Sequence, residues 1–283
     1  MVSDDTDYTQ RRMNTDNTST SDYYIPVLCV AGSDPSGGAG LQVDLKTCEA
    51  FGCYGMAVVS GLTAQSPRRV TAVRSVSDFM TAQLTTLLDE IRPAAVKTGM
   101  LPDVKAVKSV AEAIDTYGLD NVTVDPVMVS TSGHALTDDS CIEALTGLLL
   151  PRATVVTPNV PEAELLAGIS INTTEDCRHA AVLIARRYGC RAVLIKGGHI
   201  NGQNTTDTLY KADSDTFHTF TGERIDTLNS HGTGCRLSTA IACGLACGRP
   251  ITEAIKDAKQ WLESELRRYA HYRFPSPSQH KYL

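Results

Sequence analysis

The sequence predicts an α/β protein whose mainly parallel central sheet is covered by helices on both faces. Six segments rich in Val, Ile, Leu and Ala alternate along the chain with helical patterns. Most residues of each segment are apolar without strict alternation, which is typical of strands that are buried on both faces of a parallel sheet. Glycines and polar residues follow several of them directly, and open α/β sheets bind their ligands at the carboxyl ends of strands.

Local patterns predict the elements in order. The expected strands are residues 25–31, 56–62, 94–99, 121–125, 153–157 and 192–196. The expected helices between them include 41–51, 78–91 and 104–117, and Ser77 and Asp103 stand at the N-cap positions of the last two. Short segments at 208–211 and 216–220 predict a β-hairpin, and helices over 235–248 and 252–270 follow it.

The length and composition predict one large domain. The chain has 283 residues, enough to bury a substantial core, and we assign residues 24–283 to a single α/β domain. Residues 1–23 are rich in Ser, Thr, Asp and Asn and show no hydrophobic periodicity, so we expect a disordered tail. Its five Asp residues argue against an organellar transit peptide, because such peptides are poor in acidic residues.

The charge distribution argues against nucleic acid or a membrane as a partner. The net charge is −6, and the sequence has no stripe of Lys and Arg. It also has no apolar run long enough to span a bilayer and no apolar core of a signal peptide near residue 1. Nine cysteines, an odd number without a Cys-x-x-Cys pair, indicate mostly core residues in a reducing compartment. We therefore expect a cytoplasmic protein.

The motif HGTGC at 231–235 has the features of an anion-binding loop. Gly232 and Gly234 flank Thr233 and lack a Cβ, so the backbone can turn its N–H groups toward a ligand. The helix that follows adds the positive end of its dipole. Cys235 would stand at the start of that helix, where the pKa of a thiol is lowered. A Gly-x-Gly before a helix is also common as a simple tight turn.

Polar residues at other predicted strand ends fit phosphoryl transfer. Asp125 and Glu162 offer carboxylates for Mg²⁺, and Lys196 offers a cation for phosphate oxygens. The P-loop motif, the dinucleotide-binding glycine motif and the protein kinase motifs are all missing from the sequence. A P-loop enzyme, a standard dinucleotide oxidoreductase and a protein kinase are therefore disfavoured.

Seven motifs occur together in one order along most of the chain. They are AGSDPSGGAG at 31–40, TAQ at 63–65, KTGML at 97–101, DPVM at 125–128, TPNVPE at 157–162, KGGH at 196–199 and HGTGC at 231–235. In this set the chain resembles the hydroxymethylpyrimidine/phosphomethylpyrimidine kinases of thiamine biosynthesis, in the ribokinase-like superfamily. The resemblance implies a ribokinase-like fold, a requirement for ATP and Mg²⁺, two successive phosphorylations of the aminopyrimidine, and a homodimer.

The resemblance also implies roles for single residues. Cys235 matches the base on the substrate hydroxymethyl group, and Gln65 matches the residue that hydrogen-bonds the pyrimidine edge. The other residues matched to the anion hole and to the substrate pocket are Gly232, Thr233, Gly234, Asp44, Met100 and Val127.

Four further residues match the nucleotide and metal positions of that family. Asn159 and Glu162 match an element that organises Mg²⁺ and its waters beside ATP, and Asp125 is expected near the metal. Lys196 is expected to face the ATP phosphates. Two departures from the family pattern are Thr98, where Ile is usual, and Arg236, where Thr is usual. The Arg236 side chain would either contact a phosphate or point to solvent.

Simpler interpretations exist for most of these residues. Gln65 could be a polar residue at a strand exit, Glu162 could favour the first turn of a helix, and Lys196 could snorkel to the surface. Met100 and Val127 are as compatible with the core as with a pocket. We expect His199 and His231 to be structural or hydrogen-bonding residues, not catalytic ones.

Two other functions remain open at the level of the sequence. One is a pyridoxal kinase on the same fold, in which the thiol of Cys235 could add reversibly to an aldehyde. The other is a non-catalytic ligand-sensing relative that keeps the fold. The presence of Cys235, Lys196, Asp125 and Glu162 argues against the second.

Overall fold

The structure, a computed structural model, describes residues 23–67, 69–128, 138–199, 204–227 and 231–271. The tail expected at 1–23 lies outside the described residues except for its last position. In the part of the chain that the structure describes, no helix combines the length and the apolar character that crossing a bilayer would require.

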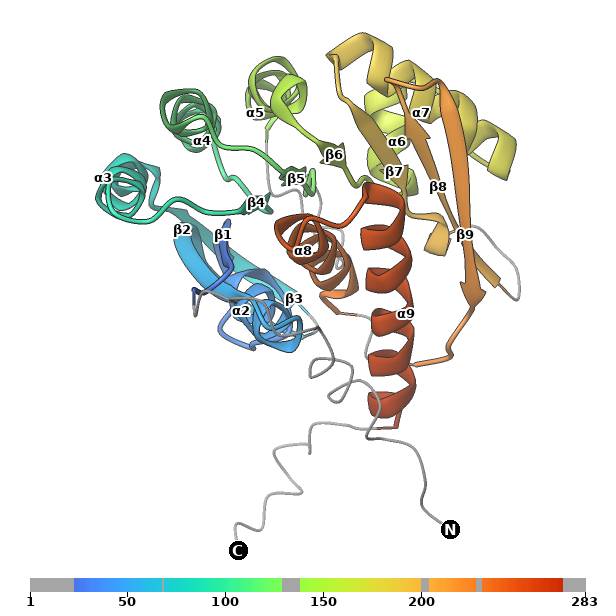
Figure 1. The fold of residues 1–283 in the computed structure, drawn as a ribbon, viewed down its shortest axis with the longest axis horizontal. Coiled ribbons are helices and arrows are strands. Elements are labelled where there is room, and N and C mark those ends of the chain that lie inside the picture. Colours follow the sequence, from blue (N-terminus) through green and yellow to red (C-terminus); the bar gives the residue numbers. More distant parts are fainter. Residues whose placement is uncertain (1–22, 68, 129–137, 200–203, 228–230, 272–283) are drawn as a thin grey trace, which may run out of the picture.

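The described strands form one sheet in the order β3-β2-β1-β4-β5-β6-β7-β8-β9 (Figure 1). Their bounds are β1 Pro26–Ser33, β2 Tyr54–Ser66, β3 Arg69–Ser75, β4 Ala95–Thr98, β5 Val122–Val124, β6 Val155–Val156, β7 Ala192–Ile195, β8 Asn204–Lys211 and β9 Thr216–Glu223. The strands from β2 through β1 and β4 to β7 run parallel, while β3, β8 and β9 pair antiparallel at the two edges. The predicted mainly parallel sheet is confirmed.

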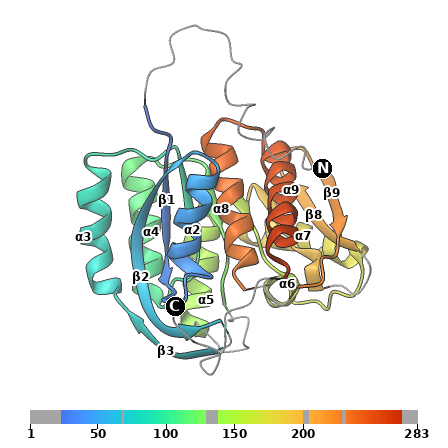
Figure 2. The same ribbon diagram turned by 90° about the horizontal axis from the view of Figure 1, so that it is seen from below.

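Helices cover both faces of this sheet. On one face lie α3 Ser77–Leu88, α4 Val104–Tyr117, α5 Asp139–Ala144, α6 Val160–Ala167 and α7 Thr174–Tyr188 (Figure 1). On the other face α2 Gly40–Ala50, α8 Thr233–Ala246 and α9 Ile251–Tyr269 lie side by side (Figure 2). Alternate side chains of β1 point to opposite faces of the sheet. Leu28 and Val30 belong to the core beneath α3 to α7, and Val27 and Cys29 belong to the core beneath α2 and α8.

Short irregular helices complete the described elements. A π-helical turn, Leu145–Leu149, and a 3-10 turn, Leu150–Arg152, continue the chain from α5 toward β6. A second 3-10 turn, Gly197–His199, follows β7 after one residue, Lys196. The predicted hairpin is present as β8 and β9, and it is longer than expected.

One of the two predicted N-caps is correct and the other is wrong. Asp103 caps α4, because its Oδ1 accepts a hydrogen bond from the N–H of Ala106 at 2.9 Å. Ser77, in contrast, is the first residue of α3, and the N-cap is Val76, which makes no side-chain cap. The Ser77 hydroxyl donates to Asp103 Oδ2 at 2.9 Å, so the same carboxylate that caps α4 holds Ser77 away from a capping role.

The strand order reverses around β1. Its neighbour on one side is β2, and on the other side it pairs with β4, which lies further along the chain. The loop after β1 and the N-terminus of α2 therefore stand at a topological switch point, where open α/β sheets form a crevice outside the carboxyl ends of their strands. The site of this protein is built at that crevice.

Candidate active site

The carboxyl ends of the parallel strands open into a cavity of about 1470 Å³. Residues that follow five of these strands line it, and all but the glycine have polar side chains, namely Asp34, Gly99, Asp125, Asn159 and Lys196. A pocket for one small ligand has a volume of roughly 300–1,000 Å³. This cavity therefore has room for two small molecules that react with each other. Every residue predicted for the site lines the cavity except Asp44.

The loop before α8 forms one wall of the cavity. Gly232 is the N-cap of α8 and has a φ of 77°, and a Cβ at this position would collide with the carbonyl oxygen of Gly38. Only glycine fits there, because the loop rests directly on the backbone of the β1–α2 connection. A Cβ placed on Gly234 would stand 3.3 Å from Lys196 Nζ. The start of α8, with its N–H groups and positive dipole end, thus points at the charged part of the cavity.

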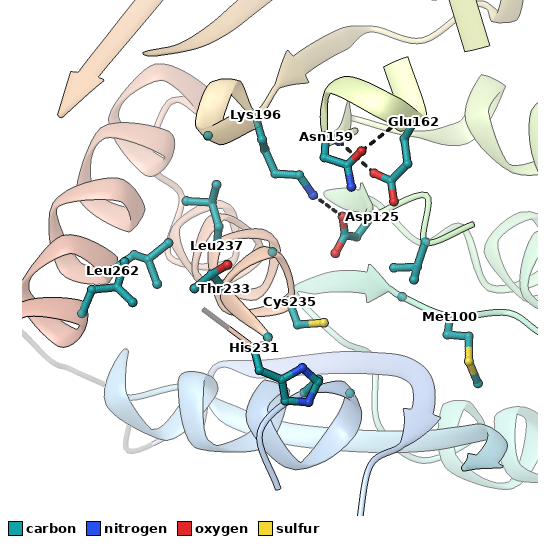
Figure 3. Close-up of a pocket in the computed structure, with 18 of the residues that line it drawn as sticks. Met100, Asp125, Asn159, Glu162, Lys196, His231, Thr233, Cys235, Leu237 and Leu262 are labelled. Atoms are coloured by element: carbon teal, nitrogen blue, oxygen red, sulfur yellow. Dashed lines mark hydrogen bonds and ion pairs between the residues drawn. The ribbon is translucent and has the colours of Figure 1, made fainter. Parts of the chain in front are cut away.

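Cys235 stands in the first turn of α8 and is half-buried (Figure 3). Burial raises the pKa of its thiol to about 11, while the charge of Lys97 acts in the opposite direction. The expectation of a lowered pKa for Cys235 is wrong, because the loss of solvent outweighs the helix dipole. At neutral pH this residue is a thiol in the ligand-free cavity.

Lys196 and Asp125 form an ion pair inside the cavity, with Nζ 2.8 Å from Oδ1 (Figure 3). Their side chains are only 13% and 3% exposed, so Lys196 does not snorkel to the surface. Burial lowers the pKa of Lys196, but Asp125 and Glu162 raise it, and the net pKa lies above the ordinary value. Ser238 on α8 donates to the other oxygen of Asp125 at 3.3 Å. These contacts fix a cation next to the start of α8.

Asn159 and Glu162 form a capping box at the start of α6. The N–H of Glu162 donates to Asn159 Oδ1 at 2.9 Å, and the N–H of Asn159 donates to Glu162 Oε2 at 2.8 Å (Figure 3). The simpler interpretation of Glu162 as a first-turn residue is therefore correct, yet the side chain also lines the cavity. Burial raises the pKa of Glu162 to about 7, Lys196 lowers it, and Asp125 raises it.

The donor set fits Mg²⁺ when phosphate groups are present. Among the described residues, no cluster of three or more His, Cys, Asp or Glu could hold a metal ion. Mg²⁺ commonly uses only one or two carboxylates and takes its other ligands from water and substrate phosphates. Asp125 and Glu162 supply such carboxylates. Burial is the main cause of the raised pKa of Glu162 and the charge of Asp125 adds to it, and a bound divalent cation would favour the charged form of both side chains.

Gln65 belongs to a hydrogen-bonded group beside the loop that precedes α8. Its amide lies between Thr63 Oγ1, at 3.1 Å, and His231 Nε2, at 3.3 Å. The same His231 nitrogen is 2.9 Å from Oδ2 of Asp34, whose side chain is almost fully buried. His231 therefore makes structural hydrogen bonds, as the sequence predicts. No role was predicted for Asp34, and its sequence signals are its position directly after β1 and its place in the motif AGSDPSGGAG.

Asp44 does not line the cavity, which corrects the sequence prediction. The side chain is fully buried, and both carboxylate oxygens accept from Lys97 Nζ, at 2.9 and 2.8 Å. Thr239 on α8 donates to Oδ1 at 2.8 Å. Asp44 faces the sheet from α2 because the lysine of β4 requires a counter-ion there.

Lys97 is a second lining residue to which sequence reasoning gave no role. Burial lowers its pKa, whereas Asp44, Cys235 and Asp125 raise it, and the net pKa lies well above the ordinary value. Lys97 is therefore a permanent cation that lines the cavity next to Cys235. A lysine inside the apolar segment 94–99 was the available signal, since such a charge is buried only with a partner.

The structure also places the remaining residues that the sequence analysis discussed. Met100 and Val127 line the cavity, and Met100 also packs against the backbone of Gly61. Thr98 is fully buried in β4, and its hydroxyl has no hydrogen-bond partner among the described residues. Arg236 lies 4.0 Å from Glu265 on α9 and does not line the cavity, so it contacts the neighbouring helix and not the predicted phosphate path.

The fold and this cavity define an ATP-dependent kinase of a small molecule with the ribokinase-like architecture. A more specific assignment comes from comparison with known proteins. The pattern of the phosphomethylpyrimidine kinase family matches residues 34–275, and this chain belongs to that family.

Individual relatives agree with the assignment. The chain is 45% identical over 242 residues to the hydroxymethylpyrimidine/phosphomethylpyrimidine kinase of Rhizobium meliloti, covering 84% of this chain and 89% of the relative. Its structure matches that of phosphomethylpyrimidine kinase from Clostridium difficile with a TM-score of 0.75 and 37% identity, over 86% of this chain and 99% of the other.

A second kind of vitamin kinase shares the fold. The pyridoxal kinase of Staphylococcus aureus, solved in complex with AMP-PCP and pyridoxal, matches with a TM-score of 0.78 and 33% identity. The match covers 87% of this chain and 88% of the other chain.

Proposed function

We propose that this protein transfers a phosphoryl group from ATP to 4-amino-5-hydroxymethyl-2-methylpyrimidine, and a second one to the resulting monophosphate, in thiamine biosynthesis. The observation that carries the proposal is the meeting of Gln65, Cys235 and the Lys196–Asp125 pair in one cavity large enough for both reactants. The identity to named hydroxymethylpyrimidine/phosphomethylpyrimidine kinases supports the choice of substrate.

The pyrimidine would bind at the wall formed by Gln65. An amide offers both a donor and an acceptor, which matches the edge of an aminopyrimidine. Thr63 Oγ1 donates to the amide oxygen, and the His231 ring, which pairs with Asp34, borders the amide nitrogen. Met100 and Val127 supply apolar contacts for the ring. The amide is therefore oriented before the substrate arrives, which lowers the entropic cost of binding.

The first transfer requires loss of a proton from a neutral alcohol. Cys235, at the start of α8, is the candidate base. The positive charge of Lys97 opposes the rise in the pKa of its thiol. Because the ligand-free thiol has a pKa of about 11, the proton moves as the bond to phosphorus forms and not before. The backbone N–H groups at 232–235 and the helix dipole stabilise the transferred phosphoryl group.

The second transfer makes a smaller demand on the base. A phosphate monoester has a second pKa near 6, so it is mostly ionised at neutral pH. Lys196 would neutralise phosphate charge in both reactions. Asp125 and Glu162 would hold Mg²⁺, which supplies further neutralisation of the phosphate oxygens when it is bound with the nucleotide.

Pyridoxal is the second candidate substrate, because solved pyridoxal kinases match this structure over most of its length. The proposal is tested by measuring kcat/KM for hydroxymethylpyrimidine and for pyridoxal side by side, with ATP and Mg²⁺. We expect the pyrimidine to be preferred by at least about tenfold, a difference of about 1.4 kcal/mol in transition-state binding. A preference for pyridoxal would overturn the proposal, and absence of any ATP turnover would favour the non-catalytic alternative.

We also predict that the protein is a homodimer and that it is cytoplasmic. Both follow from the sequence and from the family resemblance. Light scattering of the purified protein at several concentrations tests the first, and a mass near twice 30.4 kDa is expected.

A further inference from the structure

A row of thiols crosses the layer between the sheet and the helices α2 and α8. Cys29 of β1 lies 3.8 Å from Cys48 of α2, sulfur to sulfur, and Cys48 lies 3.8 Å from Cys243 of α8. Cys53, just before β2, lies 4.0 Å from Cys247 at the C-cap of α8. Free cysteines pack as small apolar residues, and their reactivity more than their packing decides whether they have a function.

The contact between Cys53 and Cys243 joins the two parts of this row. The pKa of Cys243 is raised well above the ordinary value, first by the hydrogen bond with Cys48 and next by that with Cys53. Cys53 therefore reaches the same sulfur that Cys48 contacts. Of the five thiols, only Cys247 is exposed, while the others are buried. A reagent in solution can meet the row at Cys247 alone.

This end of α8 is remote from the active site. Cys247 follows Cys235 by twelve residues of the same helix, which corresponds to about 18 Å along the axis. None of the five thiols lines the cavity. Chemistry at Cys247 can therefore be distinguished from chemistry at the catalytic thiol.

From this geometry we propose that Cys53 and Cys247 form a redox-active dithiol that low-molecular-weight disulfides, such as glutathione disulfide, convert to an intramolecular disulfide. The exposed thiolate of Cys247 attacks one sulfur of the small disulfide, forms a mixed disulfide and releases one small thiol. Cys53 then attacks the Cys247 sulfur and releases the second small thiol. Two protein thiols are oxidised, one small disulfide is reduced to two thiols, and two protons leave the protein thiols for these products.

The consequence of this exchange is a covalent link between two elements. Cys247 closes α8, whose other end carries the anion-binding loop, and Cys53 precedes β2. The link ties α8 to the sheet at the end opposite the cavity. It also protects the exposed thiol from persistent adducts, because the buried partner resolves each one.

The test is incubation of the full-length protein in buffers of glutathione and glutathione disulfide at graded ratios, followed by alkylation and non-reducing peptide mapping. We expect a Cys53–Cys247 linkage in the wild type, with no lasting glutathione adduct on Cys247. In Cys53→Ser the reaction should stop at an adduct on Cys247, and in Cys247→Ser neither product should form at this end of α8. Cys190→Ser, which removes a buried thiol on the far side of the sheet, is the matched control and should behave like the wild type.

Two results would overturn the proposal. One is a lasting glutathione adduct on Cys247 of the wild type without the linkage. The other is a disulfide between different cysteines at ratios where Cys53 and Cys247 stay reduced. The mapping of the wild type alone decides both, so the test does not depend on the folding of either variant.

Discussion

The ammonium group of Lys196 lies 2.8 Å from the carboxylate of Asp125, and the same ammonium group lowers the pKa of Glu162. One cation thus balances two carboxylates beside the start of α8. In the proposed complex with ATP, Lys196 would be shared between the phosphates and the carboxylates. A divalent cation that enters with ATP would leave Asp125 and Glu162 compensated, which couples nucleotide binding to metal binding in this cavity.

The raised pKa of Glu162 predicts a pH-dependent affinity for Mg²⁺. Below its pKa of about 7 the side chain is mostly protonated and uncharged, and above it the carboxylate is available to the metal. The Mg²⁺ concentration for half-maximal activity should therefore fall as the pH rises from 6 to 8. In Glu162→Gln this dependence should flatten and turnover should drop, while Gln at this position can still complete the capping box.

The same shift has a consequence for stability. The folded-state pKa of Glu162 is raised, so the folded protein binds a proton more tightly than the unfolded chain does, and this residue lowers stability as the pH rises from about 4.5 to about 7. Glu162→Gln should remove that loss in urea unfolding at pH 8. Glu143→Gln, at an exposed position on α5, is the control.

The metal prediction for Glu162 has its own contradicting result. An unchanged Mg²⁺ dependence of activity in Glu162→Gln would exclude the residue from the metal site.

Gln65→Leu should weaken pyrimidine binding while ATP binding stays near normal. The substitution keeps the size of the side chain and removes both hydrogen-bonding groups, so the buried edge of the ligand is left unpaired at a cost of about 1–3 kcal/mol. Calorimetry should show a loss of one to two decades in affinity, by roughly 1.4 kcal/mol per decade. Wild-type affinity for the pyrimidine in this variant would remove Gln65 from the proposed pocket.

Cys235→Ala should separate the two transfers. General-base catalysis typically contributes about 10²–10⁴-fold, and only the alcohol needs it, because the monophosphate is already ionised. Single-turnover rates measured separately should therefore fall much more for the alcohol than for the monophosphate. The wild-type rate for the alcohol should also climb with pH above neutrality, because the thiol has a pKa of about 11. Equal losses for both substrates would mean that Cys235 acts by positioning or packing.

Thr98→Val should stabilise the protein. The hydroxyl of Thr98 is buried in β4 without a hydrogen-bond partner among the described residues. Valine has the same shape without the polar group, so the variant should gain about 1 kcal/mol in the free energy of unfolding. Thr154→Val is a useful contrast, because the Thr154 hydroxyl accepts from the N–H of Val122 at 3.1 Å and its removal should destabilise. A loss of stability in Thr98→Val would show that this hydroxyl is satisfied.

Periodicity was sufficient to predict most of the sheet. The continuous apolar segments that became β1, β4, β5 and β7 are buried on both faces, and this burial is what makes such segments recognisable. The edge strand β3 was not predicted, since most of its residues are exposed and no apolar run marks it. Ser77 was misjudged because a local pattern cannot reveal that Asp103, 26 positions away, binds its hydroxyl.

The site was predictable where its residues lie next to strand ends or in short motifs. The Gly232–Cys235 loop and the Asn159–Glu162 pair are local features, and the structure places both at the cavity. The pairing of Asp44 with Lys97 depends on the packing of α2 against β4. The raised pKa of Cys235 depends on burial by several distant segments. Neither property is encoded in a local pattern.

The central claim is that one cavity phosphorylates the pyrimidine alcohol and then its monophosphate. Phosphorus NMR of a single reaction that contains hydroxymethylpyrimidine, excess ATP and Mg²⁺ tests it most directly, because the monophosphate and diphosphate products give separate signals. We expect the monophosphate to appear first and then to decline as the diphosphate forms, with two ATP consumed for each pyrimidine. Consumption that stops at one ATP with the monophosphate unchanged, or no consumption at all, would contradict the account.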